Sequence, residues 1–305
     1  LQDGAGAVAL IGTKQPMMAV GMLGSLLAGR PYLPLSSDQP KERLQRILSQ
    51  ANPGTVIDCR EAKAEQWLKR EPATQNFLIP GDPSRDAYWL FTSGSSGSPK
   101  GVRISLAALE NFVRWFCALP AIRSRKEPGA ALNQAQFSFD LSVADLWPAW
   151  MMGETVFALE PSHQADLDKL YRALGESGAT RMSCTPSFAR LCLCDKSFQR
   201  ELMPALQTVF FCGETLPART VRQLRQRFPG VTVLNAYGPT EATCAVCAVE
   251  VTGAGEPLPV GQLANAACQL LILVRDVNEL PLGDSGEIAI AGQSVASGYL
   301  NAPAE

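Results

Sequence analysis

The sequence predicts an α/β fold in which parallel sheets are covered by helices, with a smaller β-rich part towards the C-terminal end. Short apolar runs typical of strands alternate with amphipathic stretches typical of helices. The apolar runs are continuous rather than alternating, as expected of strands that are buried on both faces. From about Gly253 the helical pattern gives way to strands and turns, which indicates the separate β-rich part.

Six apolar runs are the predicted strands of the α/β part. In chain order they are VALIG at 8–12, TVID at 55–58, YWLFT at 88–92, TVFAL at 155–159, TVFF at 208–211 and VTVLNAY at 231–237. Two amphipathic stretches are predicted helices, KERLQRILSQ at 41–50 and ARTVRQLRQRF at 218–228, because each places its apolar residues on one face. In the β-rich part, LILVRDVNELPLGDSG followed by GEIAIAG predicts a strand, a turn and a strand.

Length and composition bound the classes of protein that remain. A chain of 305 residues corresponds to two domains of about 150 residues, or to one large α/β unit. We expect an α/β core at 1–252 and a β-rich subdomain at 253–305. Hydrophobic residues at 46% and charged residues at 18% exclude a disordered chain, a coiled coil and a collagen. The net charge of −2 lacks the basic excess of a protein that binds nucleic acid or an anionic membrane.

The cysteines and the single histidine limit the possible metal and nucleophile chemistry. The nine cysteines are predicted to be reduced, in a reducing, cytoplasmic compartment. Cys244 and Cys247 form a C-x-x-C without a second pair at zinc spacing, and His163 is the one histidine. A zinc site and a catalytic triad are therefore not expected. The most apolar stretch, 17–28, is shorter than the about 20 residues that span a bilayer, so no membrane insertion is expected.

The segment FTSGSSGSPKG at 91–101 directly follows a predicted strand. Its glycines permit positive φ and turn backbone N–H groups inward, while its hydroxyls and Lys100 add further donors and a positive charge. The segment matches neither the Walker A pattern nor G-x-G-x-x-G. A Gly/Ser surface linker is the alternative, but the preceding buried strand and the Pro-Lys-Gly end favour a loop that binds a polyphosphate.

Four strings in order resemble motifs of the adenylate-forming superfamily, which includes acyl-CoA synthetases, luciferases and amino-acid adenylation domains. They are RPYLPLSSDQPKERLQRIL at 30–48, TSGSSGSPKG at 92–101, NAYGPTEAT at 235–243 and GEIAIAGQSVASGYLN at 286–301. The resemblance covers nearly the whole chain. It implies the large N-terminal domain of that fold, with two parallel-type sheets, covering helices and a β-rich subdomain. The mobile C-terminal domain with its catalytic lysine is expected outside this chain.

Further strings resemble the amino-acid-activating members. In FSFDLSVADLW at 137–147, Asp140 occupies the place of the acid that pairs with the substrate ammonium, although a helix N-cap is the structural alternative. MSCTPSFARLCLCD at 182–195 and VFFCGETLPARTVRQLRQRFPG at 209–230 are similar to the D-alanine–carrier protein ligases of teichoic-acid modification. This similarity assigns Cys212 and Cys244 to the pocket of a small amino acid. Cys244 stands where that branch typically carries Val, so another small amino acid stays open.

The resemblance implies two half-reactions that use ATP and Mg²⁺. The amino-acid carboxylate attacks the α-phosphate of ATP, and the phosphopantetheine thiol of a carrier protein then accepts the aminoacyl group. Thr92, Lys100 and Glu241 are the expected catalytic residues, and Glu241 would also hold Mg²⁺. Tyr237 would stack on the adenine, and Asn235 would bond its edge. The expected ATP-binding residues are Thr92, Ser93, Gly94, Ser96, Gly213, Glu214, Asn235, Ala236, Tyr237, Gly238, Pro239 and Thr240.

Several alternatives remain open at this point. Within enzymes they are an adenylation module of a nonribosomal peptide synthetase, a stand-alone activator of another small amino acid, and an acyl-CoA synthetase, against which Asp140 argues. A non-catalytic nucleotide-binding protein is the alternative from another class, which the intact loop and Glu241 oppose. Because the chain begins at Leu1 and the catalytic lysine is expected after Glu305, we expect a piece of a longer protein that binds nucleotide but adenylates poorly alone.

Overall fold

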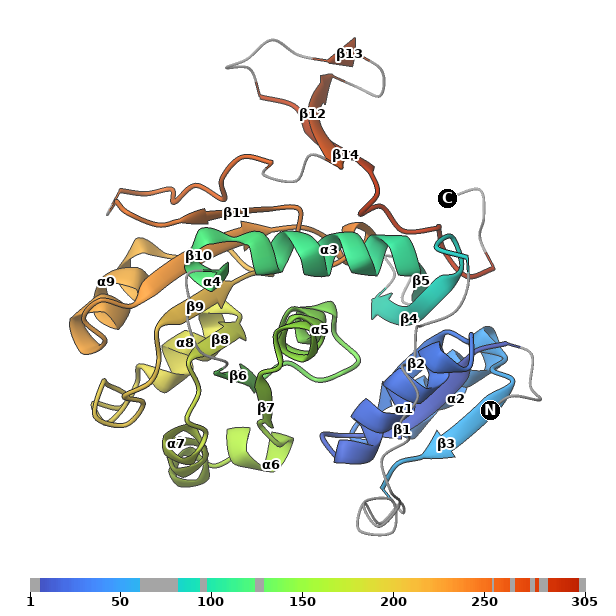
Figure 1. Cartoon of the computed structure of the whole chain (residues 1–305), viewed down its shortest axis with the longest axis horizontal. Coiled ribbons are helices and arrows are strands. Elements are labelled where there is room, and N and C mark those ends of the chain that lie inside the picture. The colour runs from blue at the N-terminus through green and yellow to red at the C-terminus, as the bar shows by residue number, and fades with distance from the viewer. Residues whose placement is uncertain are drawn as a thin grey trace. The chain divides into compact units, whose positions relative to one another are not determined.

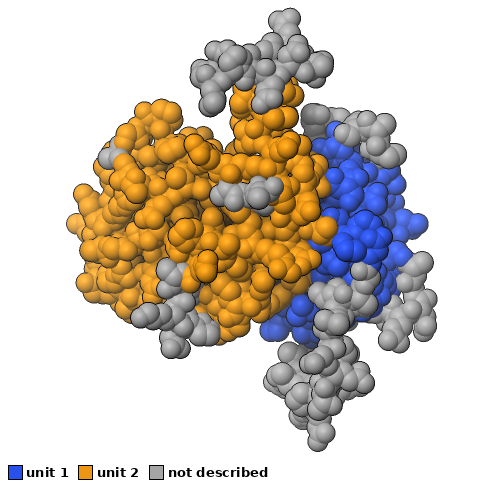
Figure 2. All heavy atoms as spheres, turned by 45° about the horizontal axis from the view of Figure 1, so that its top comes forward, with its two compact units in different colours: residues 1–106, 136–140, 296–305 blue, residues 107–135, 141–295 orange. Residues whose placement is uncertain are grey.

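The computed structural model describes residues 6–60, 82–93, 98–123, 129–253, 255–263, 267–274, 278–279 and 285–301 (Figure 1). The chain divides into two units (Figure 2). Unit 1 consists of residues 1–106, 136–140 and 296–305, and unit 2 consists of residues 107–135 and 141–295. The predicted α/β class is confirmed, while the predicted domain boundary near residue 253 stays a prediction.

Unit 1 is built on a five-stranded sheet with the strand order β3-β1-β2-β4-β5. The strands are β1 (Val8–Gly12), β2 (Tyr32–Ser36), β3 (Thr55–Asp58), β4 (Asp86–Ser93) and β5 (Pro99–Ser105). Strands β1 to β4 run parallel, whereas β5 pairs antiparallel with β4. The strands predicted at 8–12, 55–58 and 88–92 are confirmed. β3 is an edge strand with partly exposed side chains, so the expectation of burial on both of its faces is wrong.

Two helices, α1 (Pro16–Leu27) and α2 (Lys41–Ala51), pack against this sheet. In α2, which was predicted at 41–50, Ile47 is buried against Ala9 and Leu33 of the sheet. On α1, a Cβ at Gly21 would lie 2.7 Å from Leu10 Cδ2, so glycine allows α1 to approach β1 closely. In the described part of the chain, no helix combines the length and the apolar character that crossing a membrane requires.

Unit 2 contains a six-stranded sheet with the order β11-β10-β9-β8-β6-β7, parallel except for β11. Its strands are β6 (Ala130–Asn133), β7 (Thr155–Ala158), β8 (Arg181–Cys184), β9 (Thr208–Phe211), β10 (Thr232–Tyr237) and β11 (Cys247–Glu250). The runs predicted at 155–159, 208–211 and 231–237 are therefore strands. β7 lies at an edge and is partly exposed, so here too burial on both faces was the wrong expectation.

Helices cover both faces of the six-stranded sheet. Two successive residues of β9 show this, because successive side chains of a strand point to opposite faces. Phe211 belongs to the core cluster that includes Leu170, Phe188 and Leu224, whereas Phe210 packs against Phe116 with ring centroids 5.1 Å apart. In the described part of the chain, the helices and short 3₁₀ turns that follow β5 are α3 (Leu106–Ala118), α4 (Pro120–Arg123), η2 (Asp140–Ser142), α5 (Val143–Met152), α6 (Pro161–Gln164), α7 (Leu167–Glu176), α8 (Pro186–Cys192), α9 (Ala218–Arg227) and η3 (Thr240–Ala242).

The β-rich part of unit 2 is a three-stranded antiparallel sheet with the order β13-β12-β14. It is formed by β12 (Cys268–Val274), β13 (Asn278–Glu279) and β14 (Glu287–Gly292), drawn in orange to red in Figure 1. The two predicted strands are therefore confirmed, with the short β13 between them, while the residues of the predicted turn lie largely outside the described residues.

A buried charge cluster joins β8 to α5. The side chain of Arg181 is 2% exposed, and its Nε lies 2.8 Å from Glu154 Oε2. Its Nη1 lies 3.7 Å from Asp145 Oδ1 and also donates to the Ala144 carbonyl at 3.0 Å. The amide of Asn133 donates to Asp145 Oδ2 at 3.2 Å. Because buried charges are tolerated only when they are paired and hydrogen-bonded, this cluster fixes the start of α5 against the sheet.

We predict that Arg181→Met strongly destabilises the protein. The substitution leaves Asp145 and Glu154 buried without their cation, which typically costs about 3–5 kcal/mol of unfolding free energy. The matched control is Arg114→Met, because Arg114 forms an exposed pair with Glu110 whose loss costs about 0–1 kcal/mol. Urea denaturation of both variants measures the difference, and equal losses would contradict a special role for the buried cluster.

Candidate functional site

The carboxyl edge of the six-stranded sheet brings together most of the predicted site residues of unit 2. β9 and β10 are parallel neighbours with Asn235 opposite Phe211. The segments that follow them, 212–214 and 238–240, therefore leave the sheet at the same edge. Loops at the carboxyl ends of parallel strands are the usual place for ligand binding in open α/β sheets.

Hydrogen bonds hold two of these residues in place. The Ser187 backbone N–H and hydroxyl, at the start of α8, donate to the exposed Glu214 carboxylate at 3.1 and 2.6 Å. The buried Asn235 side chain donates through Nδ2 to the Pro259 carbonyl at 2.8 Å. One N–H of this amide and its carbonyl oxygen remain for other contacts. The role of Asn235 at an adenine edge therefore stays a prediction that draws on these remaining groups.

The turn after β10 is shaped by one glycine. A Cβ at Gly238 would lie 2.5 Å from Ala245 Cα and 2.9 Å from the Cys244 oxygen, so only glycine lets the two backbones pass. The chain then enters η3, which contains Thr240 and Glu241, and the Thr243 N–H donates to the Thr240 carbonyl at 3.1 Å. Ala236 is buried, whereas Tyr237, Pro239, Thr240 and Glu241 are half-buried.

The two predicted pocket cysteines lie side by side. Cys212 and Cys244 are 3% and 1% exposed, and the Cys212 Sγ lies 3.5 Å from the Cys244 carbonyl oxygen. Cys244 has a positive φ of 72°. The structure thus brings together the ends of β9 and β10 and the segment before β11. The role of the two cysteines in an amino-acid pocket stays a prediction.

The two ends of the Gly/Ser segment lie on the paired antiparallel strands β4 and β5 of unit 1. Thr92 lies opposite Lys100, and Ser93 lies opposite Pro99, at the ends of β4 and β5. Gly94 and Ser96, the other two predicted phosphate ligands of the segment, lie outside the described residues. Lys100 Nζ lies 4.9 Å from the centroid of the Tyr299 ring. The pairing of β4 with β5 places the Thr92 hydroxyl and the Lys100 ammonium on neighbouring strands.

The segment 297–300 runs along the outer side of β5. The Arg103 N–H donates to the Gly298 carbonyl at 3.0 Å, and the Leu300 N–H donates to the Gly101 carbonyl at 2.7 Å. At Gly101 a Cβ would lie 2.9 Å from the Phe91 ring and 3.1 Å from Leu300 Cβ, so the glycine of Pro-Lys-Gly is needed for this packing. The motif GYLN thereby becomes part of the support of the hairpin.

Asp140 is the half-buried first residue of η2 in unit 1. The N-cap position of α5 is Ser142, which makes no side-chain capping bond, and Asp140 lies two residues before it. In the same segment Phe137 is buried, with Lys14 Nζ 4.5 Å from its ring centroid. Asp140 belongs to unit 1, and Cys212 and Cys244 belong to unit 2. The amino-acid site as a whole therefore stays a prediction.

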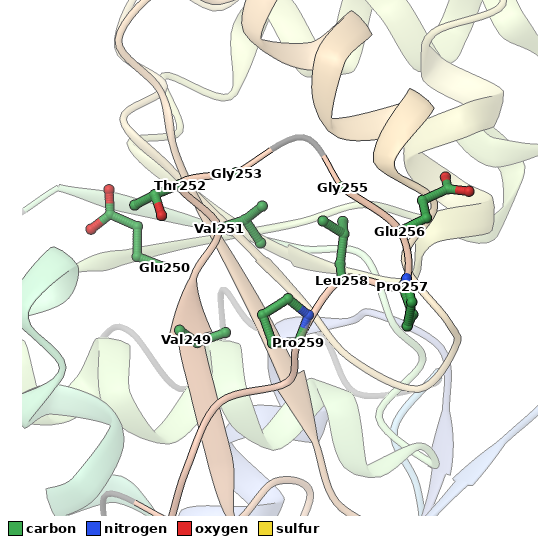
Figure 3. A pocket seen from close by; sticks show the side chains of 10 residues that line it. All are labelled: Val249, Glu250, Val251, Thr252, Gly253, Gly255, Glu256, Pro257, Leu258 and Pro259. Atoms are coloured by element: carbon green, nitrogen blue, oxygen red, sulfur yellow. The ribbon is translucent and has the colours of Figure 1, made fainter.

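A pocket of about 380 Å³ lies beside the segment that follows β11, lined by residues 249–253 and 255–259 (Figure 3). Its centre is formed by apolar side chains, including Val251, Leu258 and Pro259. The Glu256 carboxylate accepts the Ala218 N–H at the start of α9 at 3.0 Å. None of the predicted site residues lines this pocket. One lining residue, Pro259, accepts a hydrogen bond from the Asn235 side chain through its carbonyl.

Burial makes three of the cysteines poor nucleophiles. All nine cysteines are free. Burial raises the pKa of Cys117 to about 11 and that of Cys192 to about 12, and it raises the pKa of Cys184 well above its usual range. Because the thiolate is the nucleophile, these thiols are inert near neutral pH.

The sequence motifs do not indicate three side-chain contacts that the structure shows. Glu214, which is predicted at the adenine site, accepts hydrogen bonds from Ser187. Asp145, inside the motif FSFDLSVADLW, is a buried ion-pair partner of Arg181. Thr243, inside NAYGPTEAT, was assigned no role. The acid within an apolar helix was a usable signal for Asp145, because such a residue is buried only when paired.

Comparisons with known proteins found a matching family model and similar curated proteins. The family model described as "AMP-binding enzyme" matches residues 2–300. The chain is 38% identical to a D-alanine–D-alanyl carrier protein ligase of Bacillus velezensis, over 99% of this chain and 62% of the relative. It is 35% identical to a ligase of the same name from Bacillus cereus, over 99% and 62%. The chain thus spans somewhat less than two thirds of these relatives.

Solved structures of low sequence identity share the fold. A nonribosomal peptide synthetase, FmoA3, superposes with a TM-score of 0.86 at 23% identity, over 98% of this chain and 33% of the other. The N-terminal subdomain of NpsA from Klebsiella oxytoca gives a TM-score of 0.79 at 22% identity, over 97% of this chain and 76% of the other. At these identities the likeness supports the fold alone.

We predict that Gly238→Ala destabilises the protein by about 1–3 kcal/mol, because the added methyl forces the two backbones apart. Gly253→Ala is the control, since a Cβ there meets nothing within 4 Å and φ is not positive. Denaturant unfolding of both variants measures the effect. A Gly238 variant as stable as the Gly253 variant would show that the turn is not tightly packed.

We also predict selective thiol labelling at pH 8. Exposed Cys194 should react with N-ethylmaleimide before half-buried Cys117, because a pKa of about 11 leaves about one Cys117 thiol in a thousand as thiolate. Raising the pH towards 11 should narrow the difference. Mass spectrometry of digested protein after short exposures measures both rates, and faster labelling of Cys117 at pH 8 would contradict its environment.

Proposed function

The chain belongs to the AMP-binding enzyme family, and on this premise we propose that the protein activates a small amino acid, preferentially D-alanine, with ATP. The product, an aminoacyl-AMP, then donates its aminoacyl group to the phosphopantetheine thiol of a carrier protein. The names of the ligases that share 35–38% identity with the chain support this substrate and partner. The observation that carries the proposal is the turn after β10, which lies within the motif NAYGPTEAT and leads to Cys244, whose carbonyl accepts the Cys212 thiol.

ATP would be held by groups from two strand ends and one hairpin. Tyr237 would stack on the adenine, with Gly213 and Glu214 on its other side. Asn235 would bond the base edge through the groups not used by Pro259. Thr92, Ser93, Gly94 and Ser96 would bind phosphate oxygens, and Thr240 would contact the α-phosphate. For the described residues, these roles are supported by the chemistry of each group and by its place near the end of β4, β9 or β10.

The residues present fit a Mg²⁺ ion that is bound mainly through the nucleotide. Magnesium is usually held by one or two carboxylates together with water and substrate phosphates. Glu241 supplies one half-buried carboxylate at η3, and the described residues contain no cluster of three or more His, Cys, Asp or Glu that would form a protein-only cage. When bound, the ion would neutralise charge that develops on the phosphates.

The first step requires two anions to approach each other. The amino-acid carboxylate oxygen forms a bond to the α-phosphorus while the bond to the pyrophosphate oxygen breaks, so pyrophosphate leaves with the electron pair. Lys100 would offset the negative charge on the phosphates, and the Thr92 hydroxyl would orient them. In the second step the thiol sulfur attacks the carbonyl carbon, the thiol loses its proton and AMP leaves.

The amino-acid pocket would combine one charge with small walls. Asp140 would pair with the substrate ammonium, because moving a cationic amine out of water is costly without a fixed carboxylate. Cys212 and Cys244 are small and buried, which suits a methyl side chain and excludes a large one. We propose a cytoplasmic location, which the nine free thiols support. Free coenzyme A and a carrier protein offered in parallel distinguish a carrier ligase from an acyl-CoA synthetase.

We predict that Asp140→Ala abolishes amino-acid-dependent pyrophosphate exchange in the full-length protein and leaves ATP binding within about twofold. The physical reason is the loss of the carboxylate that compensates the buried ammonium. Exchange with a panel of D- and L-amino acids, and ATP titration by calorimetry, measure the two effects. Phe139→Ala at the neighbouring, 60% exposed position is the control. Unchanged amino-acid affinity in the Asp140 variant would refute the assignment.

A further inference from the structure

Two consecutive residues after η3 have the left-handed backbone conformation. Thr243 has φ 57° and Cys244 has φ 72°. Such values are uncommon outside glycine, and for a β-branched residue such as threonine they are a true outlier. Strained conformations of this kind persist only where the surrounding contacts enforce them, and they cluster at functional sites. The turn therefore needs specific contacts that hold it.

The hydroxyl of Thr243 supplies one such contact. Thr243 is completely buried, and its Oγ1 donates to the Ser294 carbonyl at 2.7 Å. The close passage of Gly238 beneath Ala245 restricts the turn from the other side. The strained residue is thus tied by its own side chain to a segment 51 positions further along the chain.

Ser294 is itself fixed by a buried polar cluster from two other elements. The Asn111 side chain, on α3, donates to Ser294 Oγ at 2.8 Å, and the Cys268 thiol, at the start of β12, donates to the same oxygen at 3.0 Å. Ser294 and Cys268 are 1% and 4% exposed. The residue whose carbonyl accepts the Thr243 hydroxyl is therefore itself hydrogen-bonded to α3 and to β12.

We propose that Thr243 is a positioning residue of the amino-acid pocket. Its hydroxyl, held by Ser294, keeps Cys244 in the left-handed conformation in which the Cys244 carbonyl meets the Cys212 thiol. Loss of this bond releases Cys244 from Cys212 and widens the wall that admits only a small side chain. This inference rests on the proposed function, because it assigns Cys212 and Cys244 to the amino-acid substrate.

The test compares two substitutions at Thr243 in the full-length protein. Thr243→Val keeps the shape and the β-branch but deletes the hydroxyl, whereas Thr243→Ser keeps the hydroxyl. We expect Thr243→Val to raise the KM for D-alanine by about 3- to 10-fold, the range that corresponds to one lost hydrogen bond, while KM for ATP changes less than twofold. Thr243→Ser should restore the KM for D-alanine to within about twofold of the original protein.

A matched control separates positioning from general loss of stability. Thr208 is also buried, and its hydroxyl also donates to a backbone carbonyl, that of Ala121 at 3.4 Å, at the start of β9. Thr208→Val should leave both KM values unchanged. Thermal unfolding of all three variants reports their stability, and the exchange assay is run well below each melting temperature.

The KM values distinguish a positioning role of Thr243 from a purely structural one. A selective rise of the D-alanine KM in Thr243→Val, reversed in Thr243→Ser, supports the proposal, and relaxed discrimination against larger amino acids would support it further. Equal rises of both KM values, or an unchanged D-alanine KM, overturn it. If the original protein exchanges pyrophosphate with no amino acid at all, the proposed function fails instead, and this result is visible before any variant is measured.

Discussion

The parallel pairing of β9 with β10 is the constraint on which the candidate site of unit 2 depends. Asn235 lies opposite Phe211, so Cys212 and Gly238 leave neighbouring strands at one edge. Because side chains alternate along a strand, a shift by one residue would turn Phe211 away from the cluster that contains Phe188 and Leu224, and Asn235 away from Pro259. The buried side chains on both faces of the sheet therefore fix the register of β9 and β10. This register in turn places the first residues of NAYGPTEAT beside the end of β9.

Buried polar contacts then set the finer geometry that apolar packing leaves open. Arg181 holds the start of α5, and Ser187 holds Glu214. Apolar side chains tolerate small shifts, whereas a hydrogen bond to a buried group loses much of its value when its partner moves. At Thr243, whose backbone has an uncommon conformation, the side-chain hydroxyl makes such a bond to the Ser294 carbonyl.

The α/β class, six strands and two helices followed from apolar patterning, because burial imposes a period that can be read directly. The sequence pattern did not predict β2, because Pro34 interrupts its apolar run and proline is rare inside a sheet. It did not predict β5 either, because this strand begins at Pro99, inside the Gly/Ser segment that was interpreted as a loop. The site motifs were found by their residue types, but the conformation of Thr243 could not be, because local preference disfavours left-handed threonine and only tertiary contacts enforce it.

The run of residues 297–300 along β5 has a consequence for the behaviour of the protein at high concentration. β5 is the last strand of its sheet, and an uncovered last strand offers free backbone groups to any other chain that arrives in extended form. Here the protein's own Gly298 and Leu300 occupy those groups. By pairing with β5, the segment prevents another chain from adding to this edge of the sheet. We expect a chain cut before Ser297 to expose the edge and to aggregate more readily.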